Sequence, residues 1–256
     1  MALRPRIIPC LLLLDGGLVK TAQFSKPKYV GDPINAVRIF NEKEVDELMV
    51  LDIMATKFKC APNYELISKL ARECRMPLCY GGGVADLDQF ERIVGLGVEK
   101  VAMSSIIMNN PNFISDCASK FGSQSVVVVF DVKKRGLLKP SYEIYTHNAK
   151  KKTGIDPIQF SRELKGLGAG ELILNSIDND GMMTGYDISL ADKILNDIDL
   201  PVTILGGAKD LADIKNIIQR YKIVGAGAGS LFVFQGKYRA VLIQYPNQVE
   251  KDALLG

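Results

Sequence analysis

The chain has 256 residues, of which 47% are hydrophobic and 24% are charged, and its formal net charge is +3. This balance is typical of a globular protein and excludes a disordered, collagen-like or coiled-coil chain. It also disfavours a nucleic-acid-binding protein, because the chain has no tryptophan and no long basic run. A weak overall charge is still compatible with a locally positive binding site.

The chain contains five cysteines and a single histidine, His147. The cysteines are irregularly spaced and form no CxxC pair, which indicates reduced thiols in a cytoplasmic protein. One histidine excludes a His-rich metal site, and we expect neither a metal nor a cofactor. The apolar segment 7–14 is interrupted by Pro9 and lacks a cleavage site, and no run reaches the roughly 18 apolar residues that span a membrane. We therefore expect no membrane contact.

Short apolar runs alternate with amphipathic stretches along the whole chain. Most runs are continuously apolar, as in parallel strands buried on both faces. Several of the stretches between them begin at Asp, Asn or Pro and end near Gly, as capped helices do. The predicted strands are 7–14, 47–53, 77–80, 100–103, 125–130, 171–175, 202–205 and 223–225, and the predicted helices are 32–45, 62–74, 86–95, 112–121, 156–167, 188–196 and 211–221. Eight β–α units in about 250 residues predict a (β/α)8 TIM barrel, with a doubly wound sheet as the weaker alternative.

Two segments of the first half recur in the second half. GGVADL at 82–87 is similar to GGAKDL at 206–211, and DEL at 46–48 is similar to GEL at 170–172. Both pairs have the same offset, so we predict one barrel domain over 1–256 built from two half-barrels, about 1–122 and 123–256. The longest irregular stretch, 133–153, is rich in lysine and is expected to be a mobile loop; loops of this length are often functional.

Glycine and serine clusters follow two pairs of predicted strands. Ligands of TIM barrels bind at the carboxyl ends of the strands, where glycines let backbone N–H groups approach a phosphate and serines add donors. We therefore predict two phosphate sites for a ligand phosphorylated at both ends, although tight turns would also explain the glycines. The candidate residues are Gly82, Gly83, Ser104 and Ser105 in the first half, and Gly206, Gly207, Gly229 and Ser230 in the second.

Seven motifs in chain order give the sequence a resemblance to a known family. They are GDP at 31–33, DEL at 46–48, LDI at 51–53, GGGV at 81–84, FGSQ at 121–124, GAGE at 168–171 and SIDNDG at 176–181. From about Arg6 to Phe234 the chain resembles the cyclase subunit of imidazole glycerol phosphate synthase. The resemblance implies a barrel that binds a bisphosphorylated ribonucleotide, receives ammonia through its interior from a glutaminase subunit, and closes an imidazole ring in histidine biosynthesis.

The resemblance also implies a catalytic pair of aspartates, one at the end of strand one and one at the end of strand five. Asp131 matches the second of these. Leu12 stands where the family has the first, and Asp15 matches a separate loop residue. Because leucine cannot transfer a proton, the loss of this group is expected to cost about 10²–10⁴-fold in rate.

Four further residues belong to the predicted mouth of the barrel. Lys20 and Asp180 match family positions near the reacting part of the ligand, and Ser176 and Gly181 lie beside Asp180 at the end of strand six. Alternatively, Asp180 has no functional role and only favours the turn at Gly181, as aspartates often do.

Charged residues begin four of the predicted strands: Arg6, Glu47, Lys100 and Glu171. Inward-pointing charges are costly unless they are paired, so a closed neutral ring is expected, with stability alone as the simpler explanation. The resemblance implies that these four residues guard the ammonia inlet, on the amino-terminal face where the glutaminase docks to form a heterodimer.

An intact inlet with half of the acid–base pair missing leads to two hypotheses. We favour a diverged paralogue that keeps the glutaminase and the ammonia conduit but not the cyclisation. Such paralogues are associated with bacterial lipopolysaccharide gene sets, where an amidotransferase makes acetamidino sugars, and segments 17–21 and 40–46 resemble that branch. The alternative is an active cyclase of histidine biosynthesis. The sister isomerase of that pathway is a weaker candidate, because it uses a similar acid pair and has no need of the ring.

Overall fold

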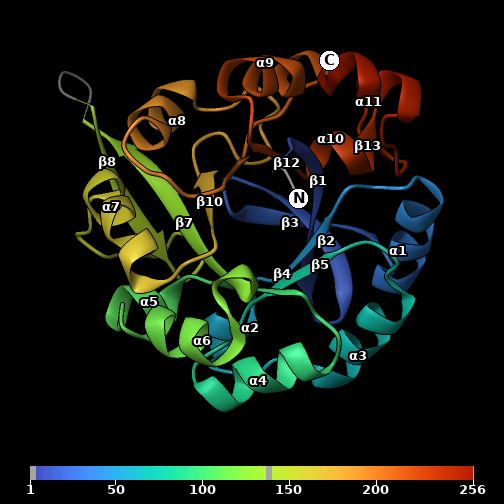
Figure 1. Ribbon diagram of the computed structural model, residues 1–256. Helices are drawn as coiled ribbons and strands as arrows, with labels where there is room; N and C mark the ends of the chain where they lie inside the picture. The colour runs from blue at the N-terminus through green and yellow to red at the C-terminus, as the bar shows by residue number, and fades with distance from the viewer. Residues whose placement is uncertain (1–3, 137–139, 256) are drawn as a thin grey trace.

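The computed structural model describes residues 4–136 and 140–255, and Figure 1 shows helices arranged around a central barrel. The barrel strands are β1 (Arg6–Leu14), β4 (Leu48–Asp52), β5 (Leu78–Gly81), β6 (Lys100–Met103), β7 (Val126–Arg135), β10 (Glu171–Ser176), β11 (Val202–Leu205) and β12 (Gly225–Ala228). They pair in parallel in this order, and β12 pairs with β1 to close the barrel. The predicted TIM barrel is confirmed, and the doubly wound alternative is wrong.

The outer ring consists of helices that connect consecutive barrel strands. They are α1 (Pro33–Glu42), α3 (Tyr64–Glu73), α4 (Leu87–Gly95), α6 (Phe113–Phe121), α7 (Pro157–Leu167), α8 (Ile188–Leu195) and α9 (Leu211–Tyr221), while α11 (Gln248–Leu255) packs beside α9. Aspartates cap several of them, because a side-chain oxygen satisfies a free N–H of the first turn. Asp86 and Asp210 have nearly the same backbone conformation, and the side chain of each accepts a hydrogen bond from the backbone N–H three residues later. The division into half-barrels stays a prediction.

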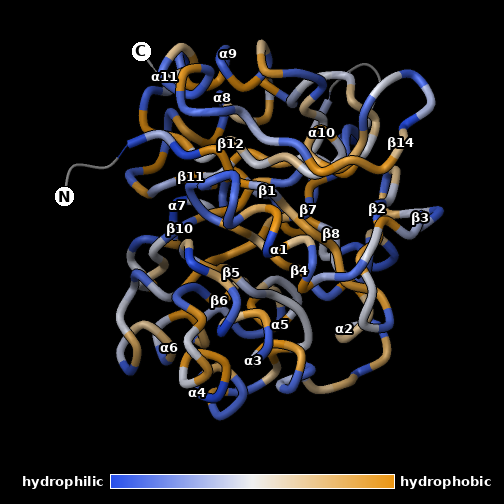
Figure 2. The backbone as a smooth tube through the Cα atoms, turned by 90° about the vertical axis from the view of Figure 1, so that its right-hand side faces the viewer, coloured by the Kyte–Doolittle hydropathy of each residue, from blue (hydrophilic) through white to orange (hydrophobic). Residues whose placement is uncertain are grey.

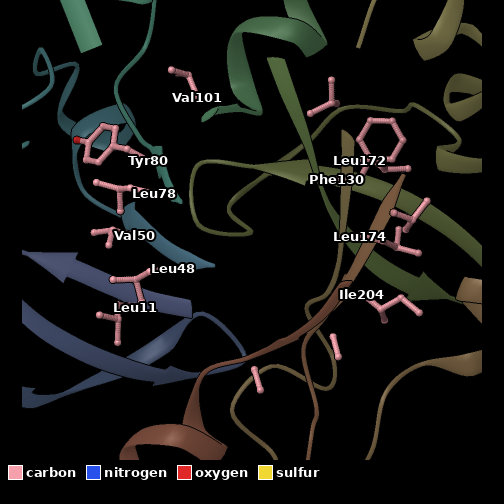
Figure 3. Close-up of a cluster of buried hydrophobic side chains, with 14 of the residues drawn as sticks. Leu11, Leu48, Val50, Leu78, Tyr80, Val101, Phe130, Leu172, Leu174 and Ile204 are labelled. Carbon is pink, nitrogen blue, oxygen red and sulfur yellow. The ribbon is translucent and has the colours of Figure 1, made fainter. Parts of the chain in front are cut away.

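Buried side chains form two layers, one on each face of the barrel sheet. Successive side chains of a strand point to opposite faces, so Leu11 packs outward against the helices while Leu12 faces the interior. Figure 3 shows part of the outer layer, including Leu48, Leu172 and Phe130. The inner layer contains Ile8, Cys10, Met49, Cys79, Ala102, Val127, Val129, Ile173 and Leu205. Burial on both faces explains why the strands read as continuous apolar runs.

The segment after the fifth barrel strand is not the irregular loop that we predicted. β7 continues beyond the barrel to Arg135 and pairs antiparallel with β8 (Ser141–Thr146), which pairs with β9 (Lys151–Lys152). Residues 137–139 of the predicted loop lie outside the described residues. The prediction failed because frequent lysines suggested a solvated loop, whereas strands with one exposed face also carry them.

Several short elements at the carboxyl ends of the barrel strands were also missed. They are the hairpin of β2 (Gly17–Ala22) and β3 (Ser25–Gly31), the hairpin of β13 (Phe234–Gln235) and β14 (Ala240–Val241), and the helices α2 (Ala55–Phe58), α5 (Ser105–Asn109) and α10 (Ser230–Val233). The 3-10 turn η1 (Ser123–Ser125), also missed, lies at the amino end of β7. The last barrel strand is shifted from the predicted 223–225, because its glycines and alanines give little hydrophobic signal. Within the described ranges, no helix has the length and apolarity needed to cross a membrane.

Candidate active site at the barrel mouth

A cavity of about 510 Å³ opens at the carboxyl ends of the barrel strands. It is lined by side chains and backbone from both halves of the chain. The predicted mouth residues that line it are Leu12, Lys20, Gly82, Gly83, Ser104, Ser105, Asp131, Asp180, Gly181, Gly206, Gly207, Gly229 and Ser230. Ser176 is buried and is not among the lining residues. The structure thus brings together residues that the sequence spreads over more than 200 positions.

Asp131 lies deep in this cavity at the interior face of β7. Asn175, its register partner on β10, donates an amide hydrogen bond to Asp131 Oδ1 over 2.9 Å. Burial raises the pKa of Asp131 to about 7, and the nearby Asp180 adds to this rise, while the bond from Asn175 opposes it. The carboxyl group can therefore hold or release a proton near neutral pH, as a general acid or base must.

Asn175 was not predicted as a functional residue. Its side chain is 5% exposed, and its Oδ1 atom has no hydrogen-bond partner among the described residues. An unpaired buried acceptor is costly unless a ligand or water satisfies it. The residue therefore orients Asp131 with one end of its amide and offers a free acceptor at the other. The only signal in the sequence was the place of Asn175 at the end of a predicted barrel strand.

Asp180 joins the loop after β10 to the first hairpin. Thr21 Oγ1 donates to Asp180 Oδ2 over 3.2 Å, and Gln23 N donates to the backbone oxygen of Asp180 over 2.8 Å. Burial raises the pKa of Asp180, while Lys20 and Thr21 favour its charged form. Asp178, by contrast, accepts from the backbone of Lys134 and does not line the cavity.

Lys20 reaches inward from β2 and is only 6% exposed. Its ammonium donates to the backbone oxygen of Cys10 over 2.6 Å. A side chain at Gly229 would place a Cβ atom 2.0 Å from Lys20 Nζ, so the glycine leaves room for this lysine.

Leu12 forms the wall opposite Asp131, because β1 and β7 lie four strands apart in an eight-stranded barrel. Leu51 is its register partner on β4, and both leucines pack against the inner apolar layer. Asp15 lies in the turn after β1, where it is exposed and does not line the cavity. β1 therefore contributes an apolar side chain and no acid to the mouth, next to the buried ammonium group of Lys20.

The glycine clusters are closely packed against neighbouring loops. Gly82 has φ of 117°, and a Cβ there would lie 2.4 Å from Asp52 O; Gly207 has φ of 110°, and a Cβ there would lie 2.1 Å from Gly185 O. Backbone packing alone therefore requires these glycines. Ser105 and Ser230 begin the short helices α5 and α10 at equivalent places of the two halves.

Two residues of the β8–β9 turn were also missed as part of the mouth. His147 and Asn148 both line the cavity and have left-handed backbone conformations. Asn148 Nδ2 donates to Ile53 O over 2.7 Å, which ties this turn to the end of β4. A loop after the fifth strand was expected at this end of the barrel, but not that its residues line the cavity.

Arg6, Glu47, Lys100 and Glu171 form a closed ring of ion pairs at the opposite end of the barrel. Lys100 Nζ lies 2.7 Å from Glu47 and 2.8 Å from Glu171, and Arg6 pairs with both glutamates. Thr203, which sequence analysis missed, donates to Glu171 over 2.5 Å. Burial raises the pKa of Glu47, which is 3% exposed, whereas Arg6 and Lys100 outweigh burial and hold the pKa of Glu171 low. Two positive and two negative groups thus neutralise one another.

A family model described as "Histidine biosynthesis protein" matches residues 6–239. A protein of Leptospira borgpetersenii, provisionally named imidazole glycerol phosphate synthase subunit HisF, is 58% identical over 98% of this chain and 99% of its own. The imidazole glycerol phosphate synthase subunit HisF of Lactococcus lactis subsp. cremoris is 37% identical over 90% of this chain and 88% of its own. The chain belongs to the HisF-like family. The resemblance inferred from the sequence motifs is confirmed.

Provisionally named relatives and relatives named HisF without qualification match different lengths of this chain. A Pseudomonas aeruginosa protein, provisionally named imidazole glycerol phosphate synthase subunit hisF2, is 48% identical over 97% of this chain and 98% of its own. The Streptococcus mutans subunit HisF, which carries no such qualification in its name, is 37% identical over 90% of this chain and 91% of its own. The provisionally named HisF-like relatives therefore match this chain over a greater length.

The raised pKa of Asp131 predicts a pH dependence of stability. Because the folded protein holds this proton more tightly than the unfolded chain, the free energy of unfolding should fall as pH rises from about 4 to 7. Asp131→Asn removes the buried charge, so at pH 8 it should be more stable than the native protein, by up to about 4 kcal/mol, with the gain disappearing near pH 4. Urea unfolding at several pH values measures this. Glu163→Gln, on the exposed face of α7, is the control; equal behaviour of the two variants would contradict the prediction.

Proposed function

We propose that this chain takes up ammonia from a docked glutaminase, conducts it through the barrel, and releases it at the mouth to a separate sugar amidotransferase of bacterial surface-polysaccharide synthesis. The observation that carries this proposal is the position of Leu12. It faces Asp131 across the cavity, where ring closure would need a second proton-transferring group. Asp180 also lines the cavity, but β1 contributes no carboxyl group opposite Asp131, and such a mouth is suited to conduct ammonia rather than to cyclise its product.

The ring at the amino-terminal end supports an inlet at that face. Its charges are fully paired, and Lys100 and Arg6 remain partly accessible from outside. A glutaminase docked on this face would deliver ammonia next to hydrogen-bonding groups that can accept and pass on a polar molecule. Ion pairs can separate and re-form without leaving an unpaired charge in the ring for long.

The barrel interior supports the passage of neutral ammonia. Apolar side chains line it, and burial raises the pKa of the Cys10 thiol to about 11, so this thiol stays uncharged. An ammonium ion would lose its hydration in such a medium, whereas ammonia loses much less. This environment favours the nucleophilic form and excludes ions. The five cysteines are all free, which supports a place in the cytoplasm.

A phosphorylated small molecule at the mouth is part of the proposal. Ser105 and Ser230 line the cavity beside the glycine clusters of the two halves, and Lys20 supplies a buried positive charge next to Gly229. These groups suit a ligand with a phosphate at each end.

An active cyclase of histidine biosynthesis is the second candidate. Lys20, Asp131 and Asp180 all line one cavity, as the family resemblance implies for that activity. The two candidates differ in whether the mouth itself carries out ring closure.

Disruption of the ring should uncouple glutamine hydrolysis from nitrogen transfer. In the complete assembly of glutaminase, this chain and the sugar amidotransferase, Lys100→Met should release more glutamate than the nitrogen found in the product. Lys100→Arg, which keeps the charge, and Lys69→Met, which breaks a surface pair with Glu65, are the controls. A Lys100→Met assembly that stays fully coupled while folded by circular dichroism would argue against an inlet at the ring.

The two serine positions should bind inorganic anions. Crystals grown in sulfate, or soaked in inorganic phosphate, should show one anion beside Ser105 and another beside Ser230. Ser105→Ala should reduce occupancy at the first position only. If both positions stay empty in saturating phosphate, the ligand part of the proposal is wrong and a simple conduit remains.

Leu12→Asp separates the two candidate functions. With ammonium supplied directly, the native chain should make imidazole glycerol phosphate very slowly, because β1 offers no carboxyl group to pair with Asp131. Leu12→Asp should raise this turnover by about 10²-fold, at some cost in stability because a charge enters an apolar wall. Leu51→Asp puts a carboxyl group on the neighbouring strand and should not do so. Native turnover of about 1 per second or faster would establish the histidine-pathway cyclase instead.

A further inference from the structure

Exposed apolar side chains are concentrated on the mouth face of the barrel. Among the described residues, those outside this face are Ile39, Ile223 and Val249. A scattered exposed side chain needs no explanation, but a concentration on one face indicates an interaction site. The exposed apolar residues on loops at the mouth are Tyr29, Phe58, Met182, Tyr238, Val241 and Leu242.

Four of these residues lie on two hairpins that touch each other. Lys28 Nζ of β3 donates to Arg239 O of the β13–β14 hairpin over 3.1 Å and lies 5.0 Å from the centre of the Phe234 ring. Figure 2 shows β2, β3 and β14 on the same side of the molecule. Tyr29 is 66% exposed and Tyr238 is 89% exposed. We call the surface formed by Tyr29, Tyr238, Val241 and Leu242 the hairpin surface.

The charge within the two hairpin segments has one sign, although the exposed Asp15 and Asp32 flank the first segment. Neither segment 17–31 nor segment 234–247 contains an aspartate or a glutamate. Lys26, Lys28, Lys237 and Arg239 lie in these segments beside the apolar residues, and no ion pair involves them within the described parts of the chain. A surface of this kind attracts negative charge and repels a second copy of itself.

The β13–β14 hairpin also lies at the end of the segment that the family model matches. The family model ends at Arg239, inside this hairpin, so Val241 and Leu242 lie beyond it. The Leptospira and Pseudomonas relatives match 97–98% of this chain, against 90% for those of Lactococcus and Streptococcus. Part of the hairpin surface, Val241 and Leu242, thus lies outside the segment that the family model matches.

We propose that the hairpin surface docks an acidic protein, and that this protein is the enzyme that accepts the ammonia. The identity of the acceptor rests on the function proposed above, whereas the docking itself rests on exposure and charge. Tyrosine and leucine side chains supply the apolar centre of such an interface, and the surrounding cations speed association and fix orientation. A partner seated here lies beside the cavity, so that ammonia leaves the barrel without entering bulk water.

The test uses the purified chain with its glutaminase and the sugar amidotransferase of the same organism as the probe. The Kd between chain and amidotransferase should rise about tenfold or more in Tyr238→Ser/Leu242→Ser. In Lys237→Glu/Arg239→Glu the association rate should fall, and the difference from the native chain should shrink in high salt. Lys237, Tyr238 and Leu242 are exposed and Arg239 is half-buried. Thermal unfolding verifies that the variants stay folded.

Matched controls replace the same residue types elsewhere on the molecule. Ile39→Ser on α1 and Lys215→Glu on α9 should bind the amidotransferase like the native chain. Product formation from glutamine should fall in the hairpin variants, while product formation from added ammonium should not, because free ammonium does not need the docked chain. This pair of measurements separates docking from chemistry.

The other possible results of these binding and product measurements each contradict one specific part of the proposal. If the native chain does not bind the amidotransferase, or the hairpin variants bind it unchanged, the docking proposal is wrong, even where glutamine still supports product formation. If binding follows the prediction but glutamine supports no product, the proposed function fails and the docking surface stands. Hairpin-dependent binding to vesicles of phosphatidylcholine and phosphatidylglycerol, without an effect on the amidotransferase, would assign the surface to a membrane. A native dimer that the hairpin variants dissociate would assign it to a second copy.

Discussion

Closure of eight parallel strands is the constraint on which the rest of this structure depends. Because side chains alternate along each strand, closure sends every second one into a common interior. The interior then has three successive zones: the charged ring at the strand starts, the apolar layer, and the polar mouth at the strand ends. A molecule that enters through the ring meets these zones in a fixed order. The fold therefore fixes the order of these three zones along the barrel axis.

The chemistry of the mouth depends on which strand ends carry ionisable groups. Asp131 has a raised pKa because burial opposes its charge, and Asn175 holds its carboxyl group in place. A second carboxyl group across the cavity would have to differ in pKa from the first to divide acid and base roles. Leu12 leaves β1 without such a group, so Asp131 faces a leucine there, while Asp180 is a second buried carboxyl group with a raised pKa at the mouth. On the function proposed above, this leucine suits the mouth to the release of a neutral molecule.

Much of the architecture could be predicted from local sequence patterns. Apolar runs give the barrel strands, and aspartates such as Asp86 and Asp210 mark helix starts because their caps act within a few residues. The family motifs placed Lys20 and Asp180 at the mouth, where the structure has them. Asn175 and Thr203 could not be identified in this way, since their roles come from partners on neighbouring strands. Local patterns carry no information on such pairs.

The two unusual features of the mouth have a common physical explanation. Ammonia that escapes into water becomes protonated and loses its nucleophilic lone pair, so a conduit works only if its outlet is covered when ammonia arrives. A cyclase covers its outlet with its own substrate, which reacts in place. On the function proposed above, a chain with Leu12 in the cavity wall lacks this complete reaction, and the next enzyme would cover its outlet. Exposed apolar side chains with a cationic surround at this outlet are what such a transfer between proteins requires.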